Sequence, residues 1–222
     1  MELDRYLPFY RLGFVCNPFR ALTSNEIGKV AVISNEITNA YKNSLDHLQI
    51  LGSEGRGKTT TLLGLASHTF PENWAYSYEY LADGQSSYRT DLSDLNIFIL
   101  DEAQRLDNAN ISRLVDSASD KLRIVFSSHE DLSDVFQRKE LRLSSFRVEV
   151  ESSAQIDEII SRRLEFFSKE ATPAITLSKQ AMDFLLITHG TDIRGMLDLL
   201  YDVFQDCRER GTLTIADIKS SI

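Results

Sequence analysis

An eight-residue glycine-rich segment has the residue types and the spacing of a phosphate-binding loop. It fits the pattern G-x-x-x-x-G-K-[ST] and reads Gly52-Ser53-Glu54-Gly55-Arg56-Gly57-Lys58-Thr59. Glycines let the backbone wrap closely around a phosphate, so that successive N–H groups point inward. Lys58 would neutralise the β- and γ-phosphates, and the Thr59 hydroxyl would bind Mg²⁺. The segment therefore predicts nucleotide binding, with Thr60 as the next residue of the binding helix.

Two adjacent acids, Asp101 and Glu102, follow an apolar run about 45 residues beyond this loop. The run, residues 96–100, has the continuous hydrophobicity of a strand buried on both faces. Open α/β sheets bind ligands at the carboxyl ends of their strands. We therefore expect Asp101 to hold Mg²⁺ and Glu102 to act as general base toward the attacking water. The alternative is that these acids cap the next helix or lie in solvent, and their pairing with the loop argues against it.

Short apolar runs alternate with helical patterns around these motifs, which predicts a parallel α/β sheet. The expected strands are residues 48–51, 74–81, 96–100, 122–126 and 146–150, and the expected helices are residues 59–68, 111–118 and 132–141. An earlier helix is expected to run from Ser24 toward Tyr41. The first domain is therefore assigned to residues 1–151, as an α/β nucleotide-binding core with an N-terminal arm.

The pattern changes after Glu151, where helical spacing dominates. Ser178 is expected to cap a second helix of this part, and Thr191 is expected to cap a third that ends at Gly211. We assign residues 152–222 to a small all-helical domain. The alternative is that these helices extend a single core.

Composition limits the function classes. The chain has 222 residues, a net charge of −9 and two distant cysteines, which fits a reducing cytoplasm and excludes a disulfide scaffold. No apolar run approaches the ~18 residues of a membrane span. A monomer this acidic is a poor non-specific nucleic-acid binder. The four histidines, His47, His68, His129 and His189, lack metal-ligand spacing. No N-K-x-D string is present, so ATP is expected rather than GTP.

The motifs together resemble the AAA+ ATPases, and within them the origin-recognition-like branch that includes ExeA-type and TniB/TnsC-type proteins. The resemblance is carried by Asn17-Pro18-Phe19, the phosphate loop, Asp101-Glu102-Ala103-Gln104 and Gly190-Thr191-Asp192-Ile193-Arg194. It implies a P-loop NTPase sheet followed by a helical lid, with ATP and Mg²⁺ between the two.

The resemblance also implies further site residues. Ser127 would sense the γ-phosphate, and the alternative is that it caps a helix. Arg194 would be the lid arginine that reaches the γ-phosphate, and the alternative is an exposed helical arginine paired with Asp198. Asn17 and Phe19 would lie beside the adenine, and the alternative is a plain turn with a buried phenylalanine.

Relatives of this kind supply an arginine finger from a neighbouring subunit, just before the last strand of the core. Arg142 matches this position best, while Arg138 and Arg147 are further candidates. An arginine there would stabilise charge that develops in the transition state. The alternative is a solvated basic surface.

Two functional hypotheses remain. In the first, an ATP-dependent homo-oligomer assembles on duplex DNA and recruits a protein partner, as TniB/TnsC-like proteins of mobile elements imply. Such an oligomer could line up Lys121 and Arg123. In the second, the chain is an ATP-gated protein-interaction switch without nucleic acid, in which hydrolysis is slow or incidental. Neither hypothesis involves a membrane.

Overall fold

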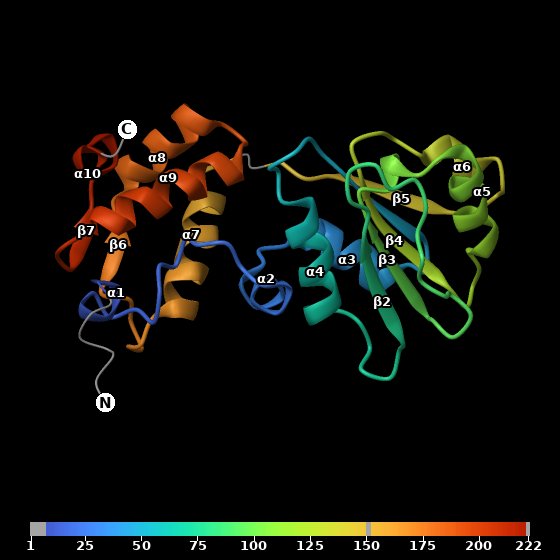
Figure 1. Cartoon of the computed structure of the whole chain (residues 1–222), viewed down its shortest axis with the longest axis horizontal. Coiled ribbons are helices and arrows are strands. Elements are labelled where there is room, and N and C mark those ends of the chain that lie inside the picture. Colours follow the sequence, from blue (N-terminus) through green and yellow to red (C-terminus); the bar gives the residue numbers. More distant parts are fainter. Residues whose placement is uncertain (1–7, 150–151, 221–222) are drawn as a thin grey trace. The chain divides into compact units, whose positions relative to one another are not determined.

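The computed structural model describes residues 8–149 and 152–220. The chain divides into two compact units (Figure 1). One unit, Ile33–Val148, is called here the α/β unit. The other combines Met1–Val32 with Glu149–Ile222 and is called the helical unit.

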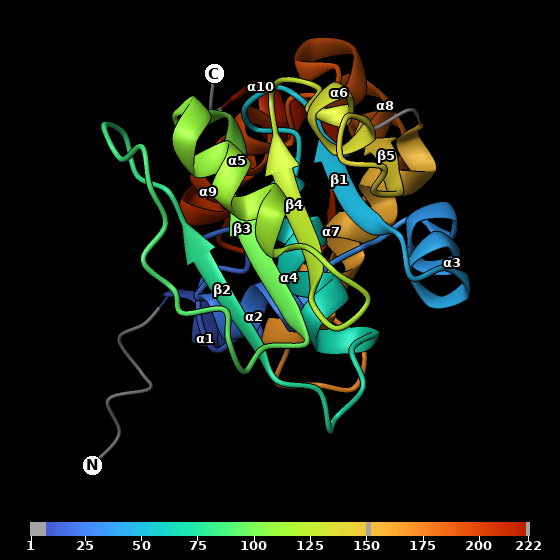
Figure 2. The same ribbon diagram turned by 90° about the vertical axis from the view of Figure 1, so that its right-hand side faces the viewer.

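The α/β unit is built on a five-stranded sheet in which every pairing is parallel, in the order β2-β3-β4-β1-β5 (Figure 2). The strands are β1 (His47–Leu51), β2 (Tyr76–Tyr80), β3 (Ile97–Asp101), β4 (Arg123–Ser128) and β5 (Leu143–Arg147). The three central strands β3, β4 and β1 are buried along their whole length. Their continuous hydrophobic runs reflect this burial, because parallel sheets are covered on both faces.

Helices cover both faces of this sheet. The helical segments of the unit are α3 (Asn35–Asn43), α4 (Lys58–His68), η2 (Ala103–Arg105), α5 (Asn108–Ser117) and α6 (Ser133–Gln137). On one face Ile97, Ile99 and Val125 pack with residues of α3 and α4. On the other face the alternate residues Phe98 and Leu100 pack with residues of α5 and α6. The two-residue period of a strand thus produces two separate cores.

The helical unit contains a small sheet as well as helices, which corrects the expectation of an all-helical domain. Its elements are α1 (Pro8–Arg11), α2 (Ser24–Val30), α7 (Ser153–Phe167), β6 (Ile175–Leu177), α8 (Lys179–His189), α9 (Ile193–Asp206), β7 (Gly211–Leu213) and α10 (Ile215–Lys219). Strands β6 and β7 pair in parallel. Both are three residues long, which is too short for a period of alternating hydrophobicity to be visible in the sequence.

The N-terminal arm belongs to the helical unit rather than to the α/β unit, so the first expected domain, residues 1–151, loses its arm and ends at Val148. Leu12, Phe14 and Phe19 are buried in one core with residues of α7 and α9. The backbone of this arm also binds the end of α7, since Val15 N donates to Phe167 O at 3.0 Å. Apolar side chains far apart in sequence unite these segments, and a reading of local patterns could not detect that.

Several expected elements have different bounds. The helix expected from Ser24 to Tyr41 is two helices, because Ser34 caps α3 anew by accepting from Ile37 N. β5 begins at Leu143, earlier than the expected strand at residues 146–150, whose last residue lies outside the described residues. Asp192 rather than Thr191 caps α9, and α9 ends at Asp206 rather than at Gly211, which is the first residue of β7. Ser178 caps α8 as expected.

Helix α6 covers less of the chain than the expected helix at residues 132–141, since it spans Ser133–Gln137. In the described part of the chain, no helix has the length and apolar character needed to span a membrane.

Candidate functional site

The glycine-rich loop connects the end of β1 to the start of α4. Gly55 has a φ of 76° and Gly57 a φ of 93°, a region in which a β-carbon is strained. Gly57 is the N-cap of α4, and no side chain makes a capping hydrogen bond there. The first N–H groups of α4 are therefore available to an anion, together with the positive end of the helix dipole.

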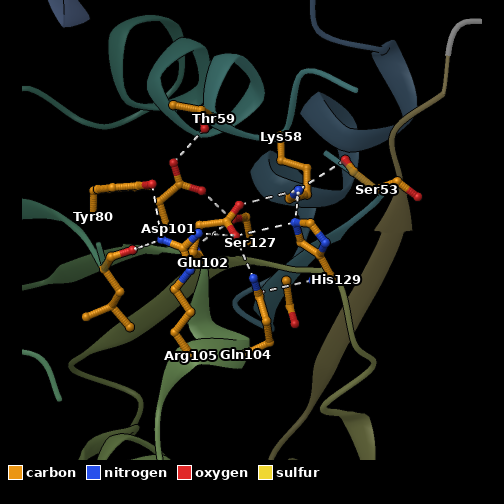
Figure 3. Close-up of polar contacts among 12 residues, drawn as sticks. Ser53, Lys58, Thr59, Tyr80, Asp101, Glu102, Gln104, Arg105, Ser127 and His129 are labelled. Carbon is orange, nitrogen blue, oxygen red and sulfur yellow. Dashed lines mark hydrogen bonds and ion pairs between the residues drawn. The ribbon is translucent and has the colours of Figure 1, made fainter. Parts of the chain in front are cut away.

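Lys58, the first residue of α4, points into a polar cluster (Figure 3). Its side chain is only 5% exposed. The ammonium donates to Ser53 O at 3.1 Å, lies 2.8 Å from His129 Nε2 and pairs with Glu102 Oε1 at 3.4 Å. A buried ammonium must have such partners, because an unpaired buried charge is costly.

Asp101 ends β3 and is completely buried. Thr59 Oγ1 donates to its Oδ2 at 2.6 Å, Tyr78 OH donates to the same oxygen at 3.0 Å, and Ser127 donates to Oδ1. Burial and then the negative charge of Asp101 raise the pKa of Tyr78, so its phenol stays a hydrogen-bond donor. A hydroxyl and a carboxylate oxygen in contact are hard ligands of the kind Mg²⁺ prefers. Thr59 and Asp101 therefore fit a magnesium site.

Glu102 follows directly and has a φ of 67°, in the left-handed region that residues other than glycine seldom adopt. The amide of Gln104 donates to its Oε2 at 2.5 Å, and Arg105 lies 3.7 Å from the same oxygen. Burial opposes ionisation of this carboxyl, but the charge of Lys58 and the hydrogen bond from Gln104 outweigh it and lower the pKa of Glu102. The carboxylate is thus ionised near neutral pH, as a general base requires.

Ser127 bridges the two acids. Its hydroxyl donates to Asp101 and accepts from Glu102 N at 2.9 Å. In this arrangement Ser127 positions the acid pair rather than capping a helix. Its expected contact with a γ-phosphate stays a prediction.

Four residues of the cluster were not among the sequence candidates: Tyr78, Gln104, Arg105 and His129. Arg105 joins Glu102 to the segment after β2, because it pairs with Asp83 Oδ1 at 2.6 Å and donates to Tyr80 OH at 3.1 Å. His129 could have been found from its place just after β4, since the carboxyl ends of neighbouring parallel strands meet at one edge. Nothing in the spacing of Tyr78 marks it as a partner of Asp101.

Asn17, Phe19 and Arg194 lie in the helical unit. Phe19 is 3% exposed and packs edge-on against Phe204, and Asn17 Nδ2 donates to Tyr201 O at 3.0 Å. This packing agrees with the buried-turn alternative for Asn17 and Phe19. Arg194 is the second residue of α9. Roles of these three residues toward a nucleotide stay predictions.

Arg142 lies at the amino end of β5, opposite the phosphate loop within the α/β unit. His47, at the start of β1, is in register with Leu143, whereas the loop follows the other end of β1. The Arg142 side chain is 81% exposed and its Nε lies 3.4 Å from Asp46 Oδ1. An arginine so placed is accessible to another molecule.

The burial of Arg123 contradicts the hypothesis that an oligomer lines up Lys121 and Arg123 on DNA. It is only 6% exposed, donates to Asp46 O and Tyr41 O, and stacks 3.9 Å from the centre of the Tyr41 ring. Burial lowers its pKa. Arg123 therefore binds backbone carbonyls in and just after the last turn of α3, while Lys121 is exposed.

Sequence comparison finds relatives at low identity. No protein-family model matches the chain. The chain is 27% identical over 201 residues to a replication factor C small subunit of Methanococcus maripaludis, which covers 82% of this chain and 62% of that protein. It is 25% identical over 181 residues to the replication factor C small subunit of Thermoplasma volcanium, which covers 73% and 55% respectively. The chain thus spans less than two thirds of the length of these curated relatives.

Solved structures share the fold. The RuvB Holliday junction branch migration motor of Thermotoga maritima aligns with a TM-score of 0.58 and 13% identity, over 92% of this chain and 72% of that one. NtrX from Brucella abortus in complex with ADP aligns with a TM-score of 0.54 and 12% identity, over 88% and 57%. The parallel sheet and these neighbours show that the chain has the AAA+ P-loop NTPase fold.

Proposed function

We propose that this chain is an AAA+ ATPase that binds Mg-ATP at the α/β unit and hydrolyses it to ADP and phosphate. The observation that carries the proposal is the convergence of Lys58, Asp101 and Glu102 at one edge of the sheet. Thr59 donates to Asp101 at 2.6 Å and Lys58 pairs with Glu102 at 3.4 Å, so loop and acids already form one cluster. The relatives' use of the same fold supports it.

Each residue then has a defined task. Loop N–H groups and the Lys58 ammonium bind the phosphates, while Thr59 and Asp101 hold Mg²⁺. The metal neutralises charge on the phosphates when it is bound. Glu102 orients the attacking water and accepts its proton, which its ionised state allows. Tyr78 and Ser127 keep Asp101 in place through their hydrogen bonds.

The resemblance to AAA+ proteins extends the proposal to the helical unit. Arg194 would report the γ-phosphate to that unit, and Asn17 with Phe19 would lie beside the adenine. Hydrolysis would then change the angle between the units or between subunits, which is how such a domain acts as a switch.

Arg142 is proposed as the finger that completes the site of a second copy. It lies at the opposite end of the sheet from Lys58, so it serves its own site poorly and is exposed to a neighbour. Activity would then require a nucleotide-dependent homo-oligomer.

Assembly on duplex DNA with recruitment of a protein partner is the finer proposal. The names of a replication factor and of a Holliday junction motor among the relatives favour a DNA transaction. The TniB/TnsC-like assignment, in DNA transposition, rests on the motif Asp101-Glu102-Ala103-Gln104 and on the lid arginine, Arg194.

An ATP-gated protein-interaction switch without nucleic acid is the second candidate. The net charge of −9 and the burial of Arg123 favour it, because both reduce the positive surface that DNA would meet.

The test is ATP turnover against protein concentration, with and without duplex DNA, for wild type, Glu102→Gln, Arg142→Ala and an equal mixture of the two variants. A shared site predicts specific activity that rises with concentration, two weak variants and partial recovery in the mixture. Recovery is expected because some sites then combine an intact Glu102 with an intact Arg142. Turnover independent of concentration, with full activity of Arg142→Ala, would reject the shared site.

The comparison of turnover with and without duplex DNA separates the two candidate functions. Salt-sensitive stimulation by duplex DNA supports the assembly on DNA. ATP binding without any response to DNA supports the protein switch.

A further inference from the structure

The imidazole of His129 lies within reach of two opposite charges. Its Nε2 is 2.8 Å from the Lys58 ammonium and 3.3 Å from Glu102 Oε2 (Figure 3). The side chain is 35% exposed, so the ring can exchange protons with solvent. The residue reaches the cluster from the end of β4, whereas Lys58 comes from α4 and Glu102 follows β3.

A single ring nitrogen cannot satisfy both neighbours at once. An ammonium only donates hydrogen bonds and a carboxylate only accepts them. Accepting from Lys58 requires Nε2 without a proton, whereas donating to Glu102 requires Nε2 with one. The two arrangements are therefore exclusive, and the position of Lys58 selects between them.

Gln104 keeps the ring near Glu102 in either arrangement. Its amide nitrogen donates to Glu102 Oε2 at 2.5 Å, and its carbonyl oxygen accepts from His129 N at 3.1 Å. This double link ties the backbone of His129 to the carboxylate. A change of partner at Nε2 thus requires departure of the lysine ammonium but no rebuilding of the rest of the cluster.

We propose that His129 is a positioning residue for Glu102, which takes up one proton from solvent when bound phosphates draw the Lys58 ammonium away. The proposal rests on the proposed binding of Mg-ATP. While Nε2 accepts from Lys58, the ring proton is on Nδ1, and Nδ1 keeps it. When Nε2 loses its donor it binds a second proton, from solvent, and donates to Glu102, so that an imidazolium replaces the ammonium beside this carboxylate. Lys58, Glu102 and, through Glu102, Arg105 are the charged groups that face the ring. Nucleotide binding and the preparation of the general base are thereby linked through one proton.

Calorimetry tests the proton directly. A non-hydrolysable ATP analogue with Mg²⁺ is titrated into the full chain at pH 7.5, in two buffers with different ionisation enthalpies. The comparison includes His129→Gln, which keeps a neutral donor, and His68→Gln, at the exposed end of α4, as a matched control. Protons that the analogue itself exchanges cancel between the variants.

Wild type and His68→Gln are expected to take up as much as about one proton more per bound analogue than His129→Gln. Equal proton uptake by wild type and His129→Gln would overturn the proposal. If the analogue binds neither wild type nor His129→Gln, or if it binds Lys58→Ala with the affinity of wild type, the proposed function itself fails and the proposal about His129 fails with it. Lys58-dependent binding with no His129-dependent proton leaves the function intact and rejects this inference alone.

The pH profile of turnover separates positioning from a structural role. Wild-type kcat is expected to fall as pH rises and the imidazolium loses its proton, while kcat of His129→Gln should stay flat over the same range. The Kd for the analogue should change less than kcat, since His129 acts on Glu102. Parallel profiles for the two proteins would contradict the proposal.

Discussion

The two units differ in what they bury. Among the described residues, the buried polar and charged side chains of the α/β unit are His47, Gln49, Lys58, Thr61, Asp101, Arg123, Ser127 and Ser128, whereas Asn17 is the one in the helical unit. The centre of the helical unit is aromatic instead. Phe14 and Phe19 pack edge-on against Phe204, with ring centroids 5.3 and 5.4 Å away.

The α/β unit thus buries polar groups of the candidate site, whereas the helical unit buries mainly apolar side chains. Buried polar groups cost free energy unless each is hydrogen-bonded. Those of the α/β unit have hydrogen-bond partners, as when Ser127 donates to Asp101 and Gln49 donates to Asp131 and to Ser145. The helical unit needs no such network, because its core is held by apolar contact. Variants of the polar cluster and of the aromatic core should therefore differ in how strongly they affect nucleotide binding and stability.

Lys58→Ala should give the largest effect on function. Removing the ammonium takes away the charge proposed to bind the phosphates, and hydrogen bonds to charged groups of this kind correspond to about 10²-fold in affinity. Glu102 keeps Gln104 and His129 as partners, so the unfolding midpoint should change little. Titration with a fluorescent ATP analogue checks affinity, and the exposed Lys42→Ala is the control. Unchanged affinity would show that Lys58 of the loop does not bind the nucleotide.

Phe204→Ala should give the largest effect on stability. The side chain is fully buried among aromatic rings, and its loss leaves a cavity that costs about 3–5 kcal/mol. Chemical denaturation measures the loss, with the partly exposed Phe166→Ala as the control. Phe204 packs against Phe19, which is proposed to lie beside the adenine, so the comparison with Lys58→Ala rests on the unfolding midpoint, which should fall far more in Phe204→Ala. A wild-type unfolding midpoint for Phe204→Ala would contradict the stabilising role of the aromatic core.

His47→Asn should change how the stability of the protein depends on pH. Burial, and then the positive charge of Arg123, lowers the pKa of His47 to about 4 from 6.5. Between these values the unfolded chain binds the proton and the folded chain does not. Stability therefore rises with pH across this window and is lost on acidification, by on the order of 3 kcal/mol in all.

In the wild-type protein the Ile124 N–H donates to His47 Nδ1 at 3.1 Å. An asparagine side chain retains an acceptor for this N–H but does not titrate. Urea unfolding from pH 4 to 7 should show a shallower pH dependence for His47→Asn than for wild type or for His68→Gln. Identical slopes in all three proteins would show that His47 does not supply this dependence.

Thr23→Ala and Asp107→Ala should give the smallest and most similar effects. Thr23 caps α2 of the helical unit, where its hydroxyl accepts from Glu26 N at 3.3 Å. Asp107 caps α5 of the α/β unit by accepting from Asn110 N at 2.8 Å. Each loss should cost about 1 kcal/mol in thermal or chemical unfolding. Nucleotide affinity should be unaffected by both, and a changed affinity in either would show that the cap acts on the site.

The parts of this structure that could be predicted from sequence are those set by local pattern. The loop with Lys58 and Thr59, the acids at the end of β3 and the parallel sheet all follow from short motifs and continuous apolar runs. The packing of the N-terminal arm with α7 and α9 could not be predicted, because it depends on apolar residues more than a hundred positions apart. Tyr78 and His129 were missed for a related reason, since strand order brings their side chains to the acids.

The proposed function requires the cluster around Lys58, Asp101 and Glu102 to bind Mg-ATP and to hydrolyse it with Glu102 as general base. The most direct test measures ATP binding and phosphate release side by side for wild type and Glu102→Gln. Mg²⁺-dependent ATP binding of similar affinity is expected in both proteins, with phosphate release about 10²–10⁴-fold slower in the variant. Wild-type phosphate release from Glu102→Gln, or no ATP binding by the wild-type protein, would contradict the proposed function.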